Sequence, residues 1–407
     1  MKLLTRVAVR ILCVMAFLMA WPGVVLAGEA ASDNKPVTIP FESVNNNIFL
    51  QVSVNSRSLW FLLDTGDKYA VIDLTAAKSL GLQLGDPVPV GGAGTNIIMG
   101  NLLRNSPFTI PGLKDFSQPL FIAVPLDDLA RRMGHEFAGT LGFDFISQFV
   151  VEIDYVKRTL TLHDRARFRY EGHGDILPIT FNAAGHPQVQ AQILDAGRPP
   201  IDGTFVFDLG SGAAVILNSP FVNREKFLQS GRPVVPWLGG RGFGGAIPGS
   251  VGRVKGLKLG SSVIDDPVIV FSQAQGGPLG SADAQGNIGA AILEKFNILL
   301  DYGNKRIILE PNANFGEPLE YSRSGLLLVA VDANNKSFRV EAVLDHAPAS
   351  ESGLRPGDLL IGVNGHAAGQ FTLSEIRAMF KSATECELTV QRDDRRLTVK
   401  LKLRRLI

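Results

Sequence analysis

The sequence predicts a mainly β protein in which two similar β-rich halves are followed by a smaller C-terminal domain. An internal repeat supports the two halves, because residues 139–164 match residues 286–312 in their spacing of apolar, glycine, aspartate and tyrosine positions. Short apolar runs between turn residues predict strands, and they suit a chain with 43 glycines and 23 prolines. A segment rich in proline, glycine and asparagine at 311–325 predicts a linker before the last domain.

The composition fits a globular chain and gives no sign of a nucleic-acid partner. Of the 407 residues, 45% are hydrophobic and 19% are charged, which is enough for two or three domains with apolar cores. The formal net charge is +1, so no broad charged surface is expected to attract nucleic acid. Basic residues near the C-terminus alternate with apolar ones, which predicts a solvated strand face.

The pattern of residues 1–27 predicts a signal peptide for export. Basic residues precede an apolar run at 11–25, and small or medium-sized residues occupy 25–27. A proline and a glycine just before those small residues favour cleavage over the alternative, an uncleaved membrane anchor. The mature protein is therefore expected to be periplasmic or extracellular, and to touch the membrane only if the signal segment is retained.

Cysteine and histidine usage argues against disulfides and metal sites. After cleavage Cys386 is the one cysteine left, so the exported chain is expected to fold without an internal disulfide. Its place in an alternating apolar stretch predicts a packed thiol rather than a nucleophile. The 6 histidines are scattered, and no pair of histidines or cysteines has the spacing typical of metal ligands. Neither a metal site nor a cofactor is expected.

The most informative local pattern is an apolar strand that ends in Asp-Thr-Gly at residues 64–66. A carboxylate on a tight turn between two apolar strands is costly unless it is hydrogen-bonded or has a function. Gly142 and Gly289 are equivalent in the repeat and lie 147 positions apart, so a counterpart of Asp64 is expected near position 211. Asp208 lies there, after an apolar strand and before Leu-Gly. The two halves are thus predicted to contribute one aspartate each to a common site.

These paired turns resemble the active-site turns of the aspartic proteases. The resemblance covers most of residues 36–311 and rests on two apolar-apolar-Asp-x-Gly motifs, two glycine-rich segments, and the tripeptides Thr-Leu-Gly and Asn-Ile-Gly at 140–142 and 287–289. Short halves without disulfides look more like the retropepsin unit, here in tandem, than like the long lobes of pepsins. The resemblance implies two acid-protease-type β-barrel half-domains, at 36–165 and 172–312, that form a pseudo-twofold bilobal unit.

The resemblance also implies a chemistry for the paired aspartates. Two carboxylates about 3 Å apart share one proton, because both cannot ionise readily so close together. The ionised carboxylate takes a proton from a bound water while the protonated one hydrogen-bonds to the scissile carbonyl. By resemblance, Asp64 and Asp208 take these catalytic roles. Four neighbours are implied to support the pair: Thr65, Gly66, Gly210 and Ser211.

Two residues depart from the family pattern. The middle residue of each triplet is normally Thr or Ser, whose hydroxyl bonds to the opposite loop; Thr65 fits and Leu209 does not, so a one-sided lock is expected. A buried N–H left unpaired by that change would cost about 1–3 kcal/mol. Asp67 stands where the family usually has Ala or Ser. Facing Asp64, it would raise the working pH of the pair; pointing outward toward Lys68, it would have no effect, and the outward orientation is the one expected.

Glycine-rich segments in both halves predict flaps that close over a substrate. The candidate flap residues are Gly92, Gly94, Gly240, Gly242 and Phe243. The second segment could also suggest a phosphate-binding loop, but it lacks the Gly-Lys-Ser/Thr ending. Trp237 and Phe243 either contact substrate or pack beside the flap, and the sequence leaves both roles open.

Residues 322–405 resemble bacterial PDZ domains, on the stretch Ser-Gly-Leu-Leu-Leu-Val at 324–329 and the run that follows at 347–365. In that family a Gly-x-x-hydrophobic loop offers N–H groups to the terminal carboxylate of a peptide, which adds as a strand. That loop is implied at Gly325, Leu326, Leu327 and Leu328. A capping-box pattern at Thr372 and Glu375 predicts the helix that forms the other wall of the groove.

Together these features predict an exported aspartic endopeptidase that hydrolyses peptide or protein substrates and captures substrates or partners through C-terminal peptides at its PDZ domain. The strongest alternative is a catalytically inactive, protease-like peptide-binding or adaptor protein of the cell envelope, which Leu209 and Asp67 favour. The presence of both aspartates at a costly site favours the enzyme. A purely structural scaffold would leave the paired Asp-x-Gly turns unexplained.

Overall fold

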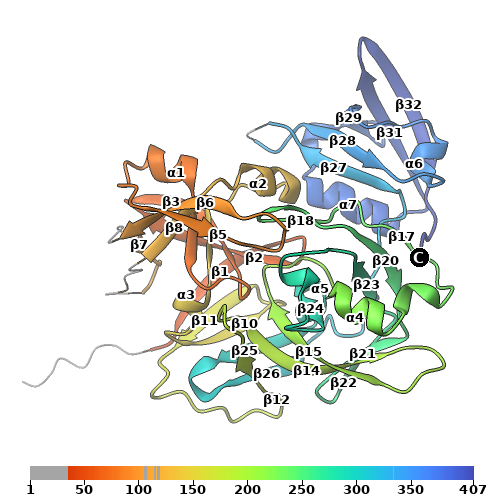
Figure 1. Ribbon diagram of the computed structural model, residues 1–407. Coiled ribbons are helices and arrows are strands. Elements are labelled where there is room, and N and C mark those ends of the chain that lie inside the picture. Colours follow the sequence, from red (N-terminus) through yellow and green to blue (C-terminus); the bar gives the residue numbers. More distant parts are fainter. Residues whose placement is uncertain (1–34, 105–107, 114–115, 117–119, 333) are drawn as a thin grey trace, which may run out of the picture. The chain divides into compact units, whose positions relative to one another are not determined.

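Strands far outweigh helices in the structure, with 43% of residues in strands and 15% in helices, which confirms the predicted mainly β class (Figure 1). The computed structural model describes these parts of the chain: 35–104, 108–113, 116, 120–332 and 334–407. Residues 36–407 form one compact unit, and the expected signal peptide lies outside the described residues. Among the helices that are described, none is both long and apolar enough to cross a membrane.

The first half consists of short strands with three helices between them. Its strands are β1 (Val37–Val44), β2 (Asn47–Val54), β3 (Arg57–Leu63), β4 (Ala70–Asp73), β5 (Pro87–Val90), β6 (Ile98–Arg104), β7 (Phe108–Thr109), β8 (Leu120–Val124), β9 (Gly139–Leu141), β10 (Val150–Asp154) and β11 (Thr159–His163). Its helices are α1 (Leu74–Ser79), α2 (Asp127–Met133) and α3 (Phe143–Ile146). The apolar end of β3 is buried, so the chain reaches the turn at Asp64 directly from the core.

The second half is also built from short strands with a few helices between them. Its strands are β12 (Asp175–Pro178), β13 (Thr180–Phe181), β14 (Pro187–Leu194), β15 (Ile201–Asp208), β16 (Val215–Leu217), β17 (Val235–Pro236), β18 (Arg241–Gly242), β19 (Gly245–Ala246), β20 (Gly249–Arg253), β21 (Gly256–Leu259), β22 (Ser262–Asp265), β23 (Val268–Ser272), β24 (Gly286–Gly289), β25 (Phe296–Asp301) and β26 (Arg306–Pro311). Its helices are α4 (Ser219–Arg224) and α5 (Ala290–Leu293), with 3₁₀ turns at Phe227–Gln229, Pro278–Gly280 and Tyr302–Asn304.

The same three-strand arrangement surrounds both Asp-x-Gly turns. In the first half β3 pairs in parallel with β9, and β9 pairs antiparallel with β4. In the second half β15 pairs in parallel with β24, and β24 pairs antiparallel with β16. Each turn therefore joins two strands that are held apart by a third strand from later in the same half. This correspondence agrees with the repeat in the sequence.

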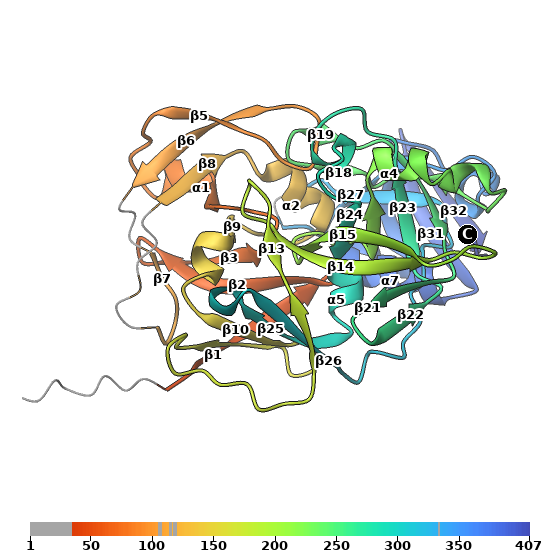
Figure 2. The ribbon, with the colours of Figure 1, turned by 60° about the horizontal axis from the view of Figure 1, so that its bottom comes forward.

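A sheet that is shared by both halves joins them. β10 of the first half pairs antiparallel with β25 of the second, so that Val151 lies opposite Leu300 (Figure 2). On either side the sheet continues through β11 and β1 and through β26 and β12. Because backbone hydrogen bonds cross from one half to the other here, the two aspartates are held by one continuous framework.

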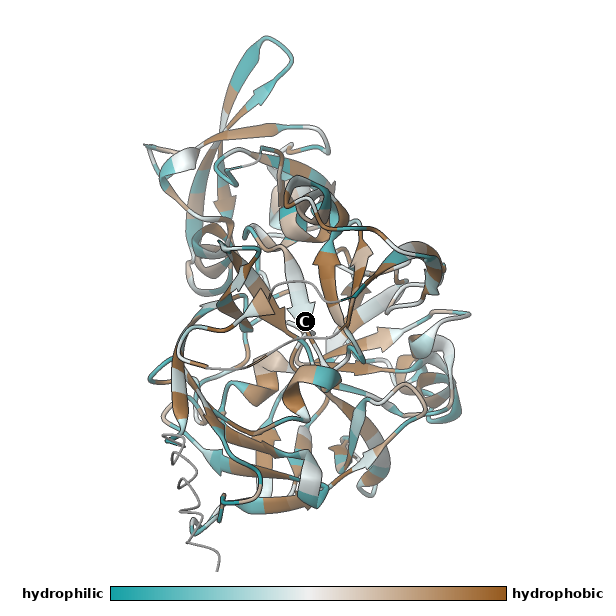
Figure 3. Ribbon diagram, turned by 90° about the vertical axis from the view of Figure 1, so that its left-hand side faces the viewer, coloured by the Kyte–Doolittle hydropathy of each residue, from teal (hydrophilic) through white to brown (hydrophobic). Residues whose placement is uncertain are grey.

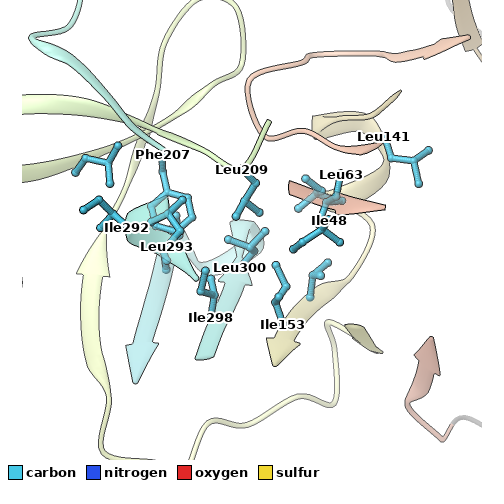
Figure 4. Packing of buried hydrophobic residues seen from close by; sticks show 14 of the residues in the cluster. Ile48, Leu63, Leu141, Ile153, Phe207, Leu209, Ile292, Leu293, Ile298 and Leu300 are labelled. Atoms are coloured by element: carbon cyan, nitrogen blue, oxygen red, sulfur yellow. The ribbon is translucent and has the colours of Figure 1, made fainter. Parts of the chain in front are cut away.

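The largest apolar core runs through both halves. Phe207, Leu209 and Leu300 are each 0% exposed, and they pack with Ile48 and Ile153 from the first half (Figure 4). Leu209 follows Asp208 directly, so its side chain anchors the second turn in this core by burial. The residue that cannot form a second hydroxyl lock thus contributes apolar packing instead.

The C-terminal domain has its own sheet and core. Its strands are β27 (Leu326–Ala330), β28 (Phe338–Val343), β29 (Leu359–Val363), β30 (His366–Ala367), β31 (Glu385–Arg392) and β32 (Arg395–Lys402), and its helices are α6 (Pro348–Glu351), α7 (Leu373–Ser382) and a 3₁₀ turn at Ala368–Gln370. β27 lies at the edge of the sheet. The predicted capping box begins α7, because Thr372 Oγ1 accepts from Glu375 N and the Glu375 carboxylate accepts from Thr372 N.

Two smaller predictions about this domain are also confirmed. Cys386 is buried on β31, and burial raises the pKa of its thiol to about 11, as suits a packed and unreactive residue. The hairpin of β31 and β32 ends in a polar tip (Figure 3). Along β32 exposed basic residues alternate with more buried apolar ones, so the basic run is a solvated strand face.

Candidate active site

Asp64 and Asp208 come from equivalent strand ends. Asp208 is the last residue of β15, and Asp64 follows the last residue of β3. The backbone of each is fixed by the third strand of its half: Asp64 N donates to Leu141 O, and Asp208 lies opposite Gly289 in the pairing of β15 with β24. Strand pairing, rather than loop conformation, therefore sets the position of both aspartates.

The two carboxyl groups converge on one place, above Gly66. A Cβ atom at Gly66 would lie 3.1 Å from Asp64 Oδ1 and 3.2 Å from Asp208 Oδ1. A Cβ atom at Gly210 would overlap the Asp64 carboxylate. Glycine at these two positions is what allows each loop to approach the aspartate of the other half so closely. The predicted pairing of Asp64 with Asp208 is thus present in the geometry.

The Thr65 hydroxyl ties the two turns together. It donates to Phe207 O at 2.5 Å and accepts from Leu209 N at 2.9 Å, and Thr65 is 0% exposed. Leu209 returns no such bond, because its side chain points into the apolar core (Figure 4). On the second turn, Asn47 Nδ2 also donates to Leu209 O. The lock is one-sided, as predicted, and the Leu209 N–H has a partner.

Asp67 faces the pair, so the expectation that it points outward is wrong. Its Oδ2 accepts a hydrogen bond from Thr140 Oγ1 at 2.5 Å, and its charge raises the pKa of Asp64. Burial raises the pKa of Asp67 itself to about 6, although the bond from Thr140 opposes that rise. The inward orientation is accompanied by this donor on β9, whose hydrogen bond offsets part of the cost of burying the Asp67 carboxyl.

Asp208 has more hydrogen-bond donors than Asp64. Its Oδ1 accepts from Gly210 N and from Ser211 N, each at 3.1 Å, and its Oδ2 accepts from Asn287 Nδ2 at 2.7 Å. The Ser211 contact is through the backbone, so its predicted supporting position does not depend on its hydroxyl. Asn287 is a further residue of the site that the sequence motifs do not single out. The signal was available in the repeat, where Asn287 is the equivalent of Thr140.

Both members of the pair hold protons more tightly than ordinary aspartates. Burial is the main cause of the raised pKa of Asp64, followed by the charges of Asp67 and Asp208; the N–H of Gly66 opposes them. Burial also raises the pKa of Asp208, against the bonds from Asn287, Ser211 and Gly210. Two such carboxyls that face each other favour a state with one proton and one negative charge. That state can act as acid and base at once.

The glycine-rich segments of the two halves meet. Gly94 N donates to Phe243 O at 2.6 Å, Asn96 N donates to Gly244 O at 3.0 Å, and a Cβ atom at Gly92 would overlap Phe243. β18 and β19 form a two-stranded hairpin, in which Gly242 is the last residue of β18 and Phe243 lies in the turn that follows. Candidate flap residues from distant parts of the sequence are therefore brought into one pair of contacting loops.

Gly240 and Trp237 lie at the base of that hairpin. Ile247 N donates to Gly240 O at 2.8 Å, and a Cβ atom at Gly240 would meet the Trp237 ring at 2.7 Å. Trp237 packs against the apolar cluster that contains Ile247 and Val251. Of the two roles left open for Trp237, packing beside the hairpin is the one that these contacts describe.

The predicted carboxylate loop of the C-terminal domain precedes edge strand β27. Gly325 has a positive φ of 73°, and a Cβ atom there would overlap Ala347, so glycine is required. Leu326 N donates to Ser324 Oγ at 3.0 Å. Leu327 and Leu328 continue along β27.

One acceptor on the edge of β27 is already in use. Arg377 Nη2, from α7, donates to Leu328 O at 2.9 Å and to Arg132 O at 2.7 Å. Arg132 belongs to α2 and also pairs with Glu341 on β28 at 2.5 Å. The Arg377 guanidinium thus links the last turn of α2 to β27, the strand beside which a peptide would be expected to add.

Replacing Thr65 by Val tests the lock between the turns. The variant keeps the size of the side chain but removes the hydroxyl, so Phe207 O and Leu209 N lose their partner. We expect the free energy of unfolding to fall by about 2–4 kcal/mol in urea titrations. Thr65→Ser keeps the hydroxyl, so its free energy of unfolding should fall by less. Thr38→Val, at an exposed position, should change the free energy of unfolding little. Unfolding of Thr65→Val at the wild-type midpoint would contradict the lock.

Replacing Asp67 by Asn tests its burial through pH. The folded pKa of about 6 exceeds the ordinary 3.8, so ionisation of Asp67 opposes folding as pH rises between those values. Asp67→Asn should therefore match wild type near pH 3.5 and be more stable by about 1–3 kcal/mol at pH 7.5 in urea titrations. Asp86→Asn, at an exposed position, should show no such difference. An Asp67→Asn effect that is the same at both pH values would contradict this account.

Comparison with known families agrees with both resemblances. Residues 50–145 match the aspartyl protease family, and residues 339–392 match the PDZ domain family. The first match includes Asp64 and Thr140 and ends before Asp208. No curated protein matches the sequence at a significant level. Residues 50–145 are thus similar to aspartyl proteases, and residues 339–392 are similar to PDZ domains.

Proposed function

We propose that this protein is an aspartic endopeptidase in which Asp64 and Asp208 together activate a water molecule against a peptide bond. The observation that carries the proposal is the convergence of the two carboxyls above Gly66, each with a raised pKa. A match to the aspartyl protease family over residues 50–145 supports the same reaction class.

The proposed reaction needs one proton on the pair. The ionised carboxylate takes a proton from water as the water oxygen attacks the carbonyl carbon, and the protonated carboxyl donates its proton to the carbonyl oxygen. In the second step the amide nitrogen is protonated by the carboxyl that received the water proton, and the C–N bond breaks. The proton of one hydroxyl of the tetrahedral intermediate returns to the other carboxylate, which restores the starting state.

The two halves are proposed to be tandem copies of one ancestral unit, at 36–165 and 172–312. The repeated strand arrangement around each turn supports this. On this proposal a single chain supplies both aspartates, and no second copy of the chain is needed to complete the site. The contacting loops that carry Gly94 and Phe243 are proposed as the flaps.

Export remains part of the proposal. The basic and apolar pattern at 1–27 supports a cleaved signal peptide, which would make the enzyme periplasmic or extracellular. The PDZ domain is proposed to capture the C-terminal ends of substrates or partner proteins at β27. Both the positive φ of Gly325 and the edge position of β27 support that mode of binding.

Asp67 favours one alternative function. A third carboxylate so near the pair could leave the site too heavily protonated or too charged for turnover, and the protein would then bind peptides without cleaving them. The site and the contacting glycine-rich loops would be the same in a protease and in a protein that only binds peptides. Only turnover distinguishes the two functions.

Cleavage of a peptide library by residues 28–407, between pH 3 and pH 8 with mass-spectrometric detection, tests the enzyme. We expect Asp64→Asn and Asp208→Asn each to lower the cleavage rate at least about 100-fold, because each removes an acid–base group. Asp86→Asn, at an exposed position, should cleave as wild type does. If wild type and both variants behave alike, the protein is not an aspartic protease.

Binding of peptides with free and amidated C-termini tests the PDZ domain. An Asp64→Asn chain, which should not cleave the probe, is titrated with fluorescent peptides that end in an apolar residue. We expect the amidated form to bind at least about 10-fold more weakly, because it lacks the charge that the N–H groups of the loop recognise. Equal binding of the two forms would contradict recognition of a terminal carboxylate.

A further inference from the structure

The two aspartates of the pair occupy different hydrogen-bond environments although they are equivalent in the repeat. Asp208 accepts three hydrogen bonds, two from backbone N–H groups on Oδ1 and one from Asn287 Nδ2 on Oδ2. Amide and backbone N–H groups can only donate, so each of these bonds is strongest when Asp208 is ionised. Asp208 is therefore the place in the site where a negative charge is best stabilised.

Asp64 lacks an equivalent side-chain donor. In the described part of the chain its carboxylate accepts one hydrogen bond, from Gly66 N at 2.7 Å. The residue equivalent to Asn287 is Thr140, whose shorter side chain donates to Asp67 Oδ2 at 2.5 Å and not to Asp64. The difference between Thr140 and Asn287 thus gives Asp67 the side-chain donor in the first half and Asp208 the side-chain donor in the second.

The charges around Asp64 act in the same direction. A negative charge there would face both Asp67 and Asp208. Asp144 contributes a further negative charge that acts on Asp67. Two acidic neighbours and few donors make Asp64 the costlier member of the pair to ionise. At Asp208 the donors oppose that cost.

We propose that Asn287 holds the negative charge of the pair on Asp208 and that Asp67 keeps the proton on Asp64. The assignment rests on the proposed function and gives each aspartate one role in it. Asp208 takes the proton from the attacking water, and Asp64 donates its proton to the carbonyl oxygen. Asn287 and Asp67 act through the aspartates rather than on substrate, so both are positioning residues. A reversed Asn287 amide would present its oxygen to Asp208 and would demand the opposite assignment.

A carboxyl ¹³C NMR titration of residues 28–407 tests the assignment without requiring turnover. Asp64→Asn and Asp208→Asn identify the two signals. We expect Asp208 to lose its proton at lower pH than Asp64 in the wild type. Asn287→Leu should raise the Asp208 midpoint by about one pH unit, and Asp67→Asn should lower the Asp64 midpoint by about one pH unit. The reverse order of ionisation, or unmoved midpoints, would overturn the proposal.

The pH dependence of kcat/KM gives a second readout that a merely structural role would not produce. Asn287→Leu should move the acid limb to higher pH, and Asp67→Asn should move the alkaline limb to lower pH, each by about one pH unit. Asn223→Leu, at an exposed position on α4, should move neither limb. If Asn287→Leu does not fold, the isosteric Asp67→Asn alone decides, through the Asp64 midpoint and the alkaline limb.

The two proposals fail in different ways. If the wild type cleaves no peptide at any pH, the proposed function is wrong, and the NMR midpoints still decide whether the charge is on Asp208. If the wild type cleaves while the midpoints and limbs stay unmoved in both variants, the assignment is wrong and the proposed function stands.

Discussion

The bridge made by the Thr65 hydroxyl, from Phe207 O to Leu209 N, is the contact on which the site depends. Two carboxylates repel each other when they are brought together away from bulk water, so something else must hold their loops in place. Here the hydroxyl bridges the loops, glycines at 66 and 210 allow the close approach, and the shared pairing of β10 with β25 fixes the two halves in one framework. The apolar core beneath, with Leu209 in it, makes that framework resistant to separation.

The halves repeat each other in their strands and differ in their polar side chains. Thr65 corresponds to Leu209, Asp67 to Ser211, and Thr140 to Asn287. A site built from two identical chains cannot differ in this way, because each change would appear twice. A single chain with two unequal halves can give its aspartates different donors and different neighbouring charges. These three unequal pairs lie at or beside the paired aspartates, where a difference between acid and base would be useful.

The repeat and the apolar periodicity predicted the strands, the paired turns and the meeting of Asp64 with Asp208, since these follow from local pattern and spacing. Asn287 was missed because its contact depends on the register of β24 beside β15, where it lies opposite Val206. The orientation of Asp67 was wrong for a similar reason: its near neighbour in sequence is Lys68, but its donor is Thr140, 73 positions away. The contact of Arg377 with both Leu328 and Arg132 likewise joins segments that no local pattern connects.

The central claim is that the two halves of one chain form a single pair of carboxyls that shares a proton. The most direct measurement is the distance between the nearest carboxyl oxygens of Asp64 and Asp208 in a crystal structure of residues 28–407 grown near pH 5. A separation of about 3 Å, with or without one water bound to both groups, is the predicted result. A separation beyond about 5 Å with no shared water would contradict the claim, because the groups could then not hold one proton between them.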